Sequence, residues 1–155
     1  MWASGVKPVT SDFSGYESKL KVTLSENLTV TTDVWTAVPF NTVVYDALEE
    51  LDAGNNRVEV LADGYYTIKY NIQVENVGDG NAAVVRLRVN GVDLVGTPAE
   101  LGHVVTSYTQ NYGAIDVQLS AGDLITIDVY HSKGSDRTLY ATQAGGTTLC
   151  MHRFA

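Results

Sequence analysis

Cysteine and histidine are scarce in this sequence of 155 residues. Its one cysteine, Cys150, can form no disulfide within the chain, and we interpret it as a small buried hydrophobic residue. The three histidines, His103, His131 and His152, lack the spacing of a metal site, and we interpret them as surface or interface residues. The sequence therefore predicts neither a disulfide framework nor a metal or other cofactor.

Long apolar runs are also absent. No run approaches the ~20 residues that a membrane-spanning helix needs. The N-terminal stretch MWASGVKPVTSDF lacks the basic segment followed by an apolar segment that marks a secretory signal. We therefore expect a protein that is made in a cytoplasm and is not exported by a cleaved signal.

Positive charge is in short supply. The chain has 10 Lys and Arg against 18 Asp and Glu, which gives a net charge of −8 and a pI of about 4.6. Such a surface repels the phosphates of nucleic acids and of anionic membranes. We therefore expect no nucleic acid and no membrane among its partners.

Catalytic motifs are missing as well. Neither a nucleophile elbow nor a phosphate-binding loop occurs. Four acids lie close together, at Asp46, Glu49, Glu50 and Asp52, but their spacing is not that of an EF-hand, and we interpret the stretch as a solvated loop. The sequence predicts no catalytic residue, and we expect the protein not to be an enzyme.

A period of two residues dominates the rest of the chain. In GYYTIKYNIQVE, residues 64–75, one side of an extended strand is apolar and is predicted to enter a core: Tyr66, Ile68, Tyr70, Ile72 and Val74. About ten such strands follow one another with turns between them, and no stretch has a helical stripe. The pattern predicts an all-β, antiparallel sandwich or jelly roll.

Individual segments give further expectations. Asn90-Gly91 predicts a two-residue hairpin turn within AAVVRLRVNGVDLV. HVVTSYTQNYG and AIDVQLS are expected as two strands, and LEELDAGNNR as a loop. Arg86 and Arg88 lie on one side of their strand, where they could pair with carboxylates, bind an anionic partner or protect a strand edge, the last being our default.

The order of these motifs from residue 35 to the end resembles a known family. DGYYTIKYNIQV, LRVNG and LSAGDLI, in this order, are similar to strands of the globular head of the complement first component, a jelly roll shared with the tumour necrosis factor superfamily. The resemblance implies a ten-stranded jelly-roll domain over residues 19–155, preceded by an arm over residues 1–18. It also implies a compact homotrimer.

The resemblance gives the strand of residues 64–75 a second role. In that family the matching strand lies in the inner sheet, whose free face turns towards neighbouring protomers. The trimer interface implied for this chain consists of Tyr65, Thr67, Lys69, Asn71, Gln73, Gln118, His152 and Phe154. A solvated outer face is the alternative interpretation, and whether a cation lies near the trimer axis stays open.

The chain departs from the animal members because no collagen-like tract precedes the head. It has instead a short arm with Trp2, Phe13 and Tyr16, which resembles the stalk-free heads of bacteria and bacteriophages. We expect a homotrimeric decoration or cement protein that stabilises a phage head. It would be made in the host cytoplasm and lie on the capsid surface, where the arm contacts the major capsid protein or another virion protein. The alternative is the receptor- or glycan-binding tip of a phage tail fibre or bacterial surface protein, with recognition by residues 49–56, 77–81 and 132–137.

Overall fold

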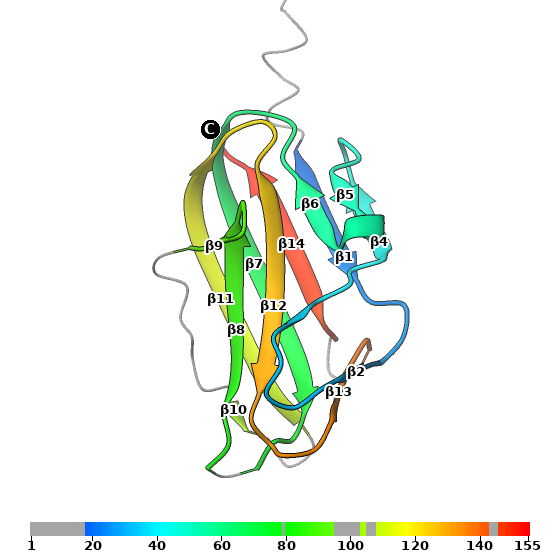
Figure 1. Ribbon diagram of the computed structural model, residues 1–155. Coiled ribbons are helices and arrows are strands. Elements are labelled where there is room, and N and C mark those ends of the chain that lie inside the picture. The colour runs from blue at the N-terminus through cyan, green and yellow to red at the C-terminus, as the bar shows by residue number, and fades with distance from the viewer. Residues whose placement is uncertain (1–17, 79, 95–102, 105–107, 143–145) are drawn as a thin grey trace, which may run out of the picture.

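The computed structural model describes residues 18–78, 80–94, 103–104, 108–142 and 146–155. These residues form two antiparallel sheets that pack face to face (Figure 1). The described residues contain fourteen strand segments, of which β3, β5, β9 and β10 are only two residues long, and one 3-10 turn, η1 (Ala53–Asn55). None of the described helical residues forms a segment long and apolar enough to cross a bilayer.

The first sheet has eight strands, in the order β10-β11-β7-β14-β1-β4, with β13 pairing to both β7 and β2. Its strands are β1 (Lys19–Thr23), β2 (Leu28–Val30), β4 (Thr42–Asp46), β7 (Gly64–Glu75), β10 (His103–Val104), β11 (Tyr108–Leu119), β13 (Arg137–Leu139) and β14 (Thr148–Arg153). The C-terminal strand β14 thus lies in the middle of this sheet, between β7 and β1.

The second sheet has six strands, in the order β5-β6-β12-β8-β9, with β3 pairing to β12. Its strands are β3 (Thr36–Ala37), β5 (Leu51–Asp52), β6 (Arg57–Glu59), β8 (Ala83–Val89), β9 (Val92–Asp93) and β12 (Leu124–His131). Every pair of strands in both sheets is antiparallel, which confirms the predicted all-β antiparallel sandwich.

The core lies between the two sheets. The apolar side of β7 enters it as predicted: Tyr66, Ile68, Ile72 and Val74 are completely buried, and Tyr70 is nearly so. The six-stranded sheet contributes Leu87, Ile125, Ile127 and Val129 from the opposite side. Because burial of each large apolar side chain stabilises the fold by about 1.5–3 kcal/mol, this alternation determines which face of β7 points inward.

The predicted hairpin turn is confirmed. Asn90 and Gly91 have φ angles of 53° and 78°, the left-handed values that a two-residue type I′ turn requires. The side chain of Asn90 also bonds across to the next hairpin. It donates to Asp123 Oδ1 at 2.8 Å and accepts from the backbone N–H of Leu124 at 2.9 Å.

Two local predictions were wrong. The residues expected as two strands around Gly113 form one strand, β11, of twelve residues that pairs with β7 along its whole length. The expected loop LEELDAGNNR contains β5 and η1, and β5 pairs with β6. At Gly113 cross-strand pairing overrides the local preference of glycine for turns. Gly54, Asn55 and Asn56 do form a turn, and only the two residues before it pair as a strand.

Candidate functional site

The eight-stranded sheet has one side that packs on the core and one side that faces away from it. We call this second side the open face. It consists of Tyr65, Thr67, Lys69 and Asn71 on β7, Tyr112, Ala114, Asp116 and Gln118 on β11, Cys150, His152 and Phe154 on and after β14, Lys19 and Lys21 on β1, and Tyr45 on β4. On β1, β7, β11 and β14 these residues alternate with residues that face the core, so the sequence pattern that builds the core also builds the open face. No residue of β4 is buried, and Tyr45 belongs to the face because it pairs with Lys21.

Strand register arranges the open face in rows that cross the strands. One row contains Lys19, His152, Thr67 and Asp116, in that order. The next row contains Lys21, Cys150, Lys69 and Ala114. Neighbouring members of a row lie on strands about 4.8 Å apart. In the first row the hydroxyl of Thr67 donates a hydrogen bond of 2.5 Å to Asp116 Oδ1, which holds that carboxylate in place.

Aromatic side chains lie at one end of the open face. The rings of Tyr65 and Phe154 are 6.2 Å apart between centroids, and these residues are 48% and 44% exposed. Backbone bonds hold them together, since Phe154 N donates to Tyr65 O and Tyr65 N donates to Ala155 O. Gly64 allows this approach, because a β-carbon there would collide with the Arg153 side chain and the Ala155 carbonyl.

Gln73 does not belong to the open face, which corrects one of the eight predicted interface residues. Its side chain is completely buried within the chain. The connection from β13 to β14 covers it: Tyr140 N donates to Gln73 O at 2.8 Å, and Gln73 N donates to Thr147 Oγ1 at 3.2 Å. The same connection accepts a hydrogen bond from Asn71, whose amide donates to Gly146 O at 2.8 Å. At the Gln73 end of β7, the connection to β14 therefore covers the face.

The other seven predicted interface residues do lie together on the open face. Tyr65, Lys69, Gln118, His152 and Phe154 are exposed, while Thr67 and Asn71 are half-buried. Trp2, Phe13 and Tyr16, predicted to contact a shell, lie outside the described residues. Sequence reasoning missed Lys19, Lys21, Tyr45, Tyr112 and Asp116, although the alternation of KLKVT already places both lysines opposite the core residues Leu20 and Val22.

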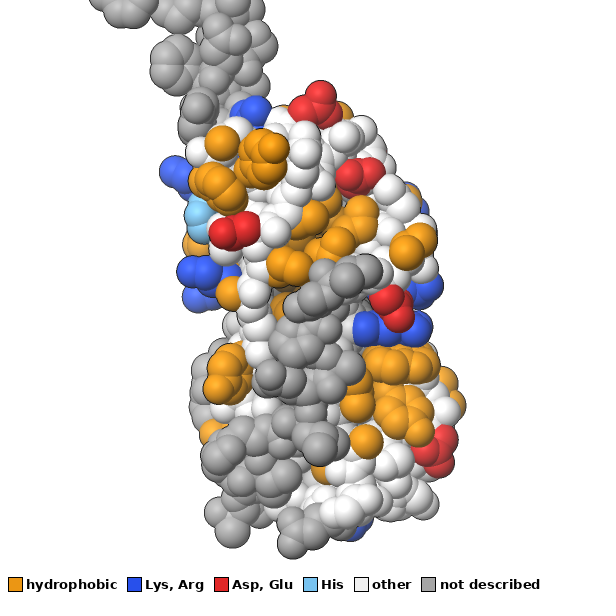
Figure 2. Space-filling view, turned by 90° about the vertical axis from the view of Figure 1, so that its left-hand side faces the viewer, with side chains coloured by type: hydrophobic (Ala, Val, Ile, Leu, Met, Phe, Trp, Pro, Cys, Tyr) orange, Lys and Arg blue, Asp and Glu red, His pale blue; other side chains and the backbone are white. Residues whose placement is uncertain are grey.

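The open face is more basic than the rest of this acidic protein. Among the described residues, no carboxylate lies within 4 Å of Lys19, Lys21 or Lys69. Figure 2 shows Lys, Arg and His side chains gathered along the left-hand border, on the side of this sheet. Burial raises the pKa of the Cys150 thiol, although Lys21 and Lys69 favour the thiolate. A protonated thiol is a poor nucleophile, so this arrangement does not point to covalent catalysis.

The two strand arginines form a different surface, on the six-stranded sheet. Arg86 binds Asp128 through Nε and Nη2, both at 2.8 Å from Oδ2, and its guanidinium lies 4.1 Å from the ring centroid of Trp35. Arg88 Nε lies 3.2 Å from Asp93 Oδ1. Of the three roles considered for these arginines, pairing with carboxylates is the one that the structure shows.

The four clustered acids do not converge on a site. Asp46 accepts from the backbone N–H groups of Glu50 and Leu51 at 2.9 and 2.8 Å, and Asp52 binds Arg57 at 2.9 Å. Glu50 is only 1% exposed, so its interpretation as part of a solvated loop was wrong. Among the described residues, no group of three or more His, Cys, Asp or Glu is arranged to hold a metal ion.

Glu50 is buried because its two oxygens have partners inside the chain. Ser18 Oγ donates to one at 2.8 Å, and the backbone N–H of Leu61 donates to the other at 3.2 Å. Burial raises the pKa of this carboxyl, and the two hydrogen bonds oppose the shift in part. Since Ser18 is itself completely buried, this contact fixes the first described residue to the domain.

His131 was predicted to be a surface or interface histidine, and this was wrong because it is completely buried. Its Nε2 lies 2.9 Å from Val30 O, and Lys133 N lies 3.4 Å from its Nδ1. A carbonyl can only accept and a backbone N–H can only donate. These two partners match the tautomer in which Nε2 donates to Val30 O and Nδ1 accepts from Lys133 N–H.

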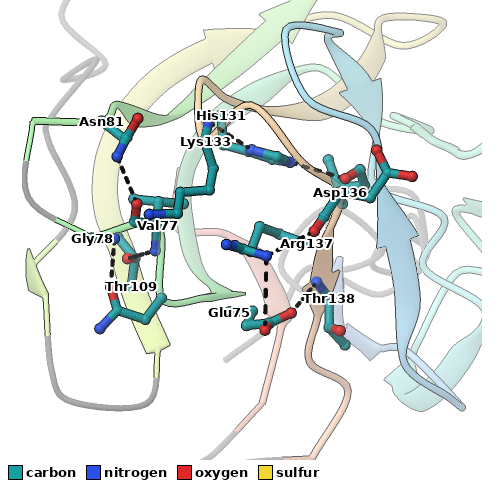
Figure 3. A network of polar contacts seen from close by, with 12 residues as sticks. Glu75, Val77, Gly78, Asn81, Thr109, His131, Lys133, Asp136, Arg137 and Thr138 are labelled. Carbon is teal, nitrogen blue, oxygen red and sulfur yellow. Dashed lines mark hydrogen bonds and ion pairs between the residues drawn. The ribbon is translucent and has the colours of Figure 1, made fainter.

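Two of the three loops expected for recognition meet at one end of the sandwich (Figure 3). Ala82, the residue directly after the segment 77–81, bonds to Ser132 at the start of the segment 132–137: Ala82 N donates to Ser132 Oγ at 2.9 Å, and Ser132 N donates to Ala82 O at 3.0 Å. Residues 49–56 lie beside β4 and β6, away from that end (Figure 1). The three segments therefore do not form one recognition surface.

These features define an all-β module with one open sheet face and, in the described residues, no convergent catalytic group. No family model and no curated protein matches the sequence. Solved structures do match in fold. The globular domain of zebrafish complement 1qA protein has a TM-score of 0.62 at 15% identity, with 89% of this chain and 98% of that chain covered.

Two members of the tumour necrosis factor group are similar to the same extent. Murine APRIL at pH 5.0 has a TM-score of 0.61 at 20% identity, with 88% of this chain and 98% of that chain covered. Eiger TNF from S. frugiperda has a TM-score of 0.57 at 15% identity, with 88% and 92% covered. The fold is therefore the jelly roll of the complement-head and tumour necrosis factor type, as the sequence motifs indicated.

Proposed function

We propose that this protein is a non-enzymatic structural protein that assembles as a homotrimer through its open face. The observation that carries the proposal is the exposure of large aromatic residues there. Tyr112 is 68% exposed, Tyr45 49%, Tyr65 48% and Phe154 44%. Protein–protein interfaces are enriched in tyrosine and phenylalanine, which bury a large area and lose little conformational entropy.

The polar residues of the open face also suit a subunit contact. Thr67, Asn71, Gln118 and His152 can each donate and accept hydrogen bonds across an interface. A stable contact has to bury on the order of 800 Å² on each partner. A face that crosses five strands of a sheet has room for contacts of this size.

The proposal extends to a virus particle, where the trimer would decorate and stabilise a phage head. This part rests on the arm, whose Trp2, Phe13 and Tyr16 would give each trimer three aromatic tethers to a shell protein. Multivalent attachment of this kind raises affinity without any new type of contact. Capsid decoration needs no catalytic group. The clustered acids and the two strand arginines fit such a role, because they pair with neighbours within the chain.

Two experiments test the proposal. Sedimentation equilibrium of the purified protein at micromolar concentration should give a mass three times that of the 16.7 kDa chain. Cryo-electron microscopy of particles assembled with and without the protein should then show added density at threefold or quasi-threefold positions of the shell. A monomer in sedimentation contradicts the trimer, and shells without added density contradict the decoration role.

One observation favours the alternative role as a receptor- or glycan-binding tip. The loops at 77–81 and 132–137 share one end of the sandwich, where Ala82, directly after the first loop, is hydrogen-bonded to Ser132 of the second. Paired loops on a rigid scaffold are a common setting for recognition. Binding of the isolated trimer to a glycan array, together with no affinity for shells, would reverse the order of the two roles.

A further inference from the structure

The two lateral halves of the open face differ in charge. The β11 half carries the carboxylate of Asp116, and β11 contains no Lys or Arg. The opposite half carries Lys19 and Lys21 on β1. Asp46, at the end of β4, pairs with the core residue Leu20 and not with either lysine, and it accepts two backbone hydrogen bonds. The face of one copy is thus acidic at one side and basic at the other.

A threefold ring brings these two halves together. If the axis runs along the strands, each copy meets the next through opposite sides of its sheet, because a cyclic contact joins two different patches. The β11 side of one copy then adjoins the β1–β4 side of its neighbour. Rotation about the axis leaves height along the axis unchanged, so residues of the same row meet across the contact.

Asp116 and Lys19 belong to the same row, because Asp116 pairs with Thr67, Thr67 with His152, and His152 with Lys19. We propose that Asp116 forms an ion pair with Lys19 of the next copy, and that Tyr112 packs against Tyr45 of that copy. This inference rests on the proposed trimer. It specifies how the open face is used and predicts an assembly held in part by charge.

The local geometry suits the ion pair. Thr67 engages Oδ1 of Asp116, so the carboxylate is held on the face and Oδ2 is available to a cation. Lys19 is exposed and has no carboxylate within 4 Å in the described part of its own chain. Burying a lysine at an interface without a counter-charge costs several kcal/mol, so a contact over this half of the face needs an acid opposite it.

The exposed tyrosines give a second, independent sign of complementarity. Tyr112 pairs with Asn71 in a row adjacent to that of Lys21, and Lys21 pairs with Tyr45. The two tyrosines therefore lie at opposite sides of the face and about 7 Å apart in height, which is within reach of their side chains. Tyr112 is 68% exposed and Tyr45 49%, and neither ring packs against another aromatic ring of the described residues.

A charge reversal tests the pair. In Asp116→Lys and in Lys19→Asp, like charges would face each other at all three contacts of the ring. We expect each single variant to raise the concentration at which the trimer dissociates at least about tenfold, and the double variant to return it to within about threefold of wild type. Sedimentation equilibrium at low and high salt measures these concentrations, and the wild-type trimer should be weaker at high salt.

Asp136→Lys is the matched control, because Asp136 is exposed in the loop between β12 and β13, outside the strands that form the row of Lys19. It should leave assembly unchanged. Circular dichroism establishes that each variant is folded, and Asp116→Asn, which keeps an acceptor for Thr67, replaces Asp116→Lys if that variant is not. If the wild-type protein is a trimer and neither single reversal raises the dissociation concentration, the ion pair is overturned while the trimer stands. The same holds if the double variant does not recover the wild-type value. A monomeric wild-type protein overturns both.

Discussion

The ring of Tyr70 lies in the space that a side chain at Gly113 would occupy. The two residues are direct cross-strand partners on β7 and β11, and the side chain of Tyr70 points into the sandwich. A β-carbon at Gly113 would lie 2.5 Å from the Tyr70 hydroxyl oxygen and 2.6 Å from Cζ of the ring. The glycine is therefore part of the packing of a long strand and does not mark its end.

Gly113→Ala should destabilise the fold by about 1–3 kcal/mol, because the added methyl group collides with a buried ring. Urea unfolding measures the loss. In a Tyr70→Leu background the same change should cost less, since the ring that it strikes is gone. Gly54→Ala is the control, because the nearest atom to a β-carbon there is 3.7 Å away. An equal cost of Gly113→Ala in both backgrounds would contradict the packing role.

Features of the fold that depend on local sequence patterns were predictable, and features that depend on contacts between distant residues were not. The side of β7 that enters the core and the turn at Asn90-Gly91 were predictable, because alternation and left-handed φ angles are local properties. The continuity of β11 was not, because it depends on Tyr70, a residue distant in sequence. Gln73 illustrates the same limit, since its place in the alternation predicts exposure while a later connection covers it.

The open face, too, was predictable from the sequence only in part. Seven of the eight predicted interface residues lie on it, because one strand's alternation and a family resemblance were enough to find them. The charge difference between its two sides was not predictable, since it depends on which strands lie at which side of the sheet. That order, with β14 between β7 and β1, is a property of the topology.

Glu50→Gln should make the protein more stable than wild type at pH 7. Burial raises the pKa of Glu50 in the folded state above the unfolded value of about 4.5, so the folded state binds this proton more tightly. The contribution of Glu50 to stability is thus fully present below that value and is lost as pH rises through the raised pKa. A neutral glutamine, which can donate to Ser18 and accept from Leu61, avoids this loss.

Urea unfolding of wild type and Glu50→Gln between pH 4 and pH 8 tests this expectation. The advantage of the variant should be small near pH 4 and grow towards neutral pH. Glu26→Gln removes an exposed carboxylate and controls for the change in net charge. An advantage for Glu50→Gln that does not vary with pH, or that is largest in acid, would contradict the assignment.

His131→Leu should destabilise the protein by about 1–3 kcal/mol. The substitution leaves Val30 O and the N–H of Lys133 without their ring partners, and Val30 is itself buried. It also loosens the link between the end of β12 and β2. His152→Leu, on the open face, should change monomer stability little. Thermal unfolding at a concentration below the assembly midpoint compares the two monomers, and similar losses would show that burial of His131 is not the cause.

The reactivity of Cys150 reports whether the open face is accessible to solvent, because Cys150 is the only cysteine in the chain and lies between Lys21 and Lys69. If the face is a subunit contact, the rate of thiol modification by a disulfide reagent should fall at least about tenfold as protein concentration rises through the assembly midpoint.

For a control, Val92→Cys in a Cys150→Ser background places the thiol on β9, at a position 70% exposed in the wild type. The rate at this control site should not depend on concentration. Because burial already raises the pKa of Cys150, the experiment is best run at pH 8, where more of the thiol is ionised. A rate for Cys150 that stays constant while sedimentation shows trimers would place the subunit contact on another face of the molecule.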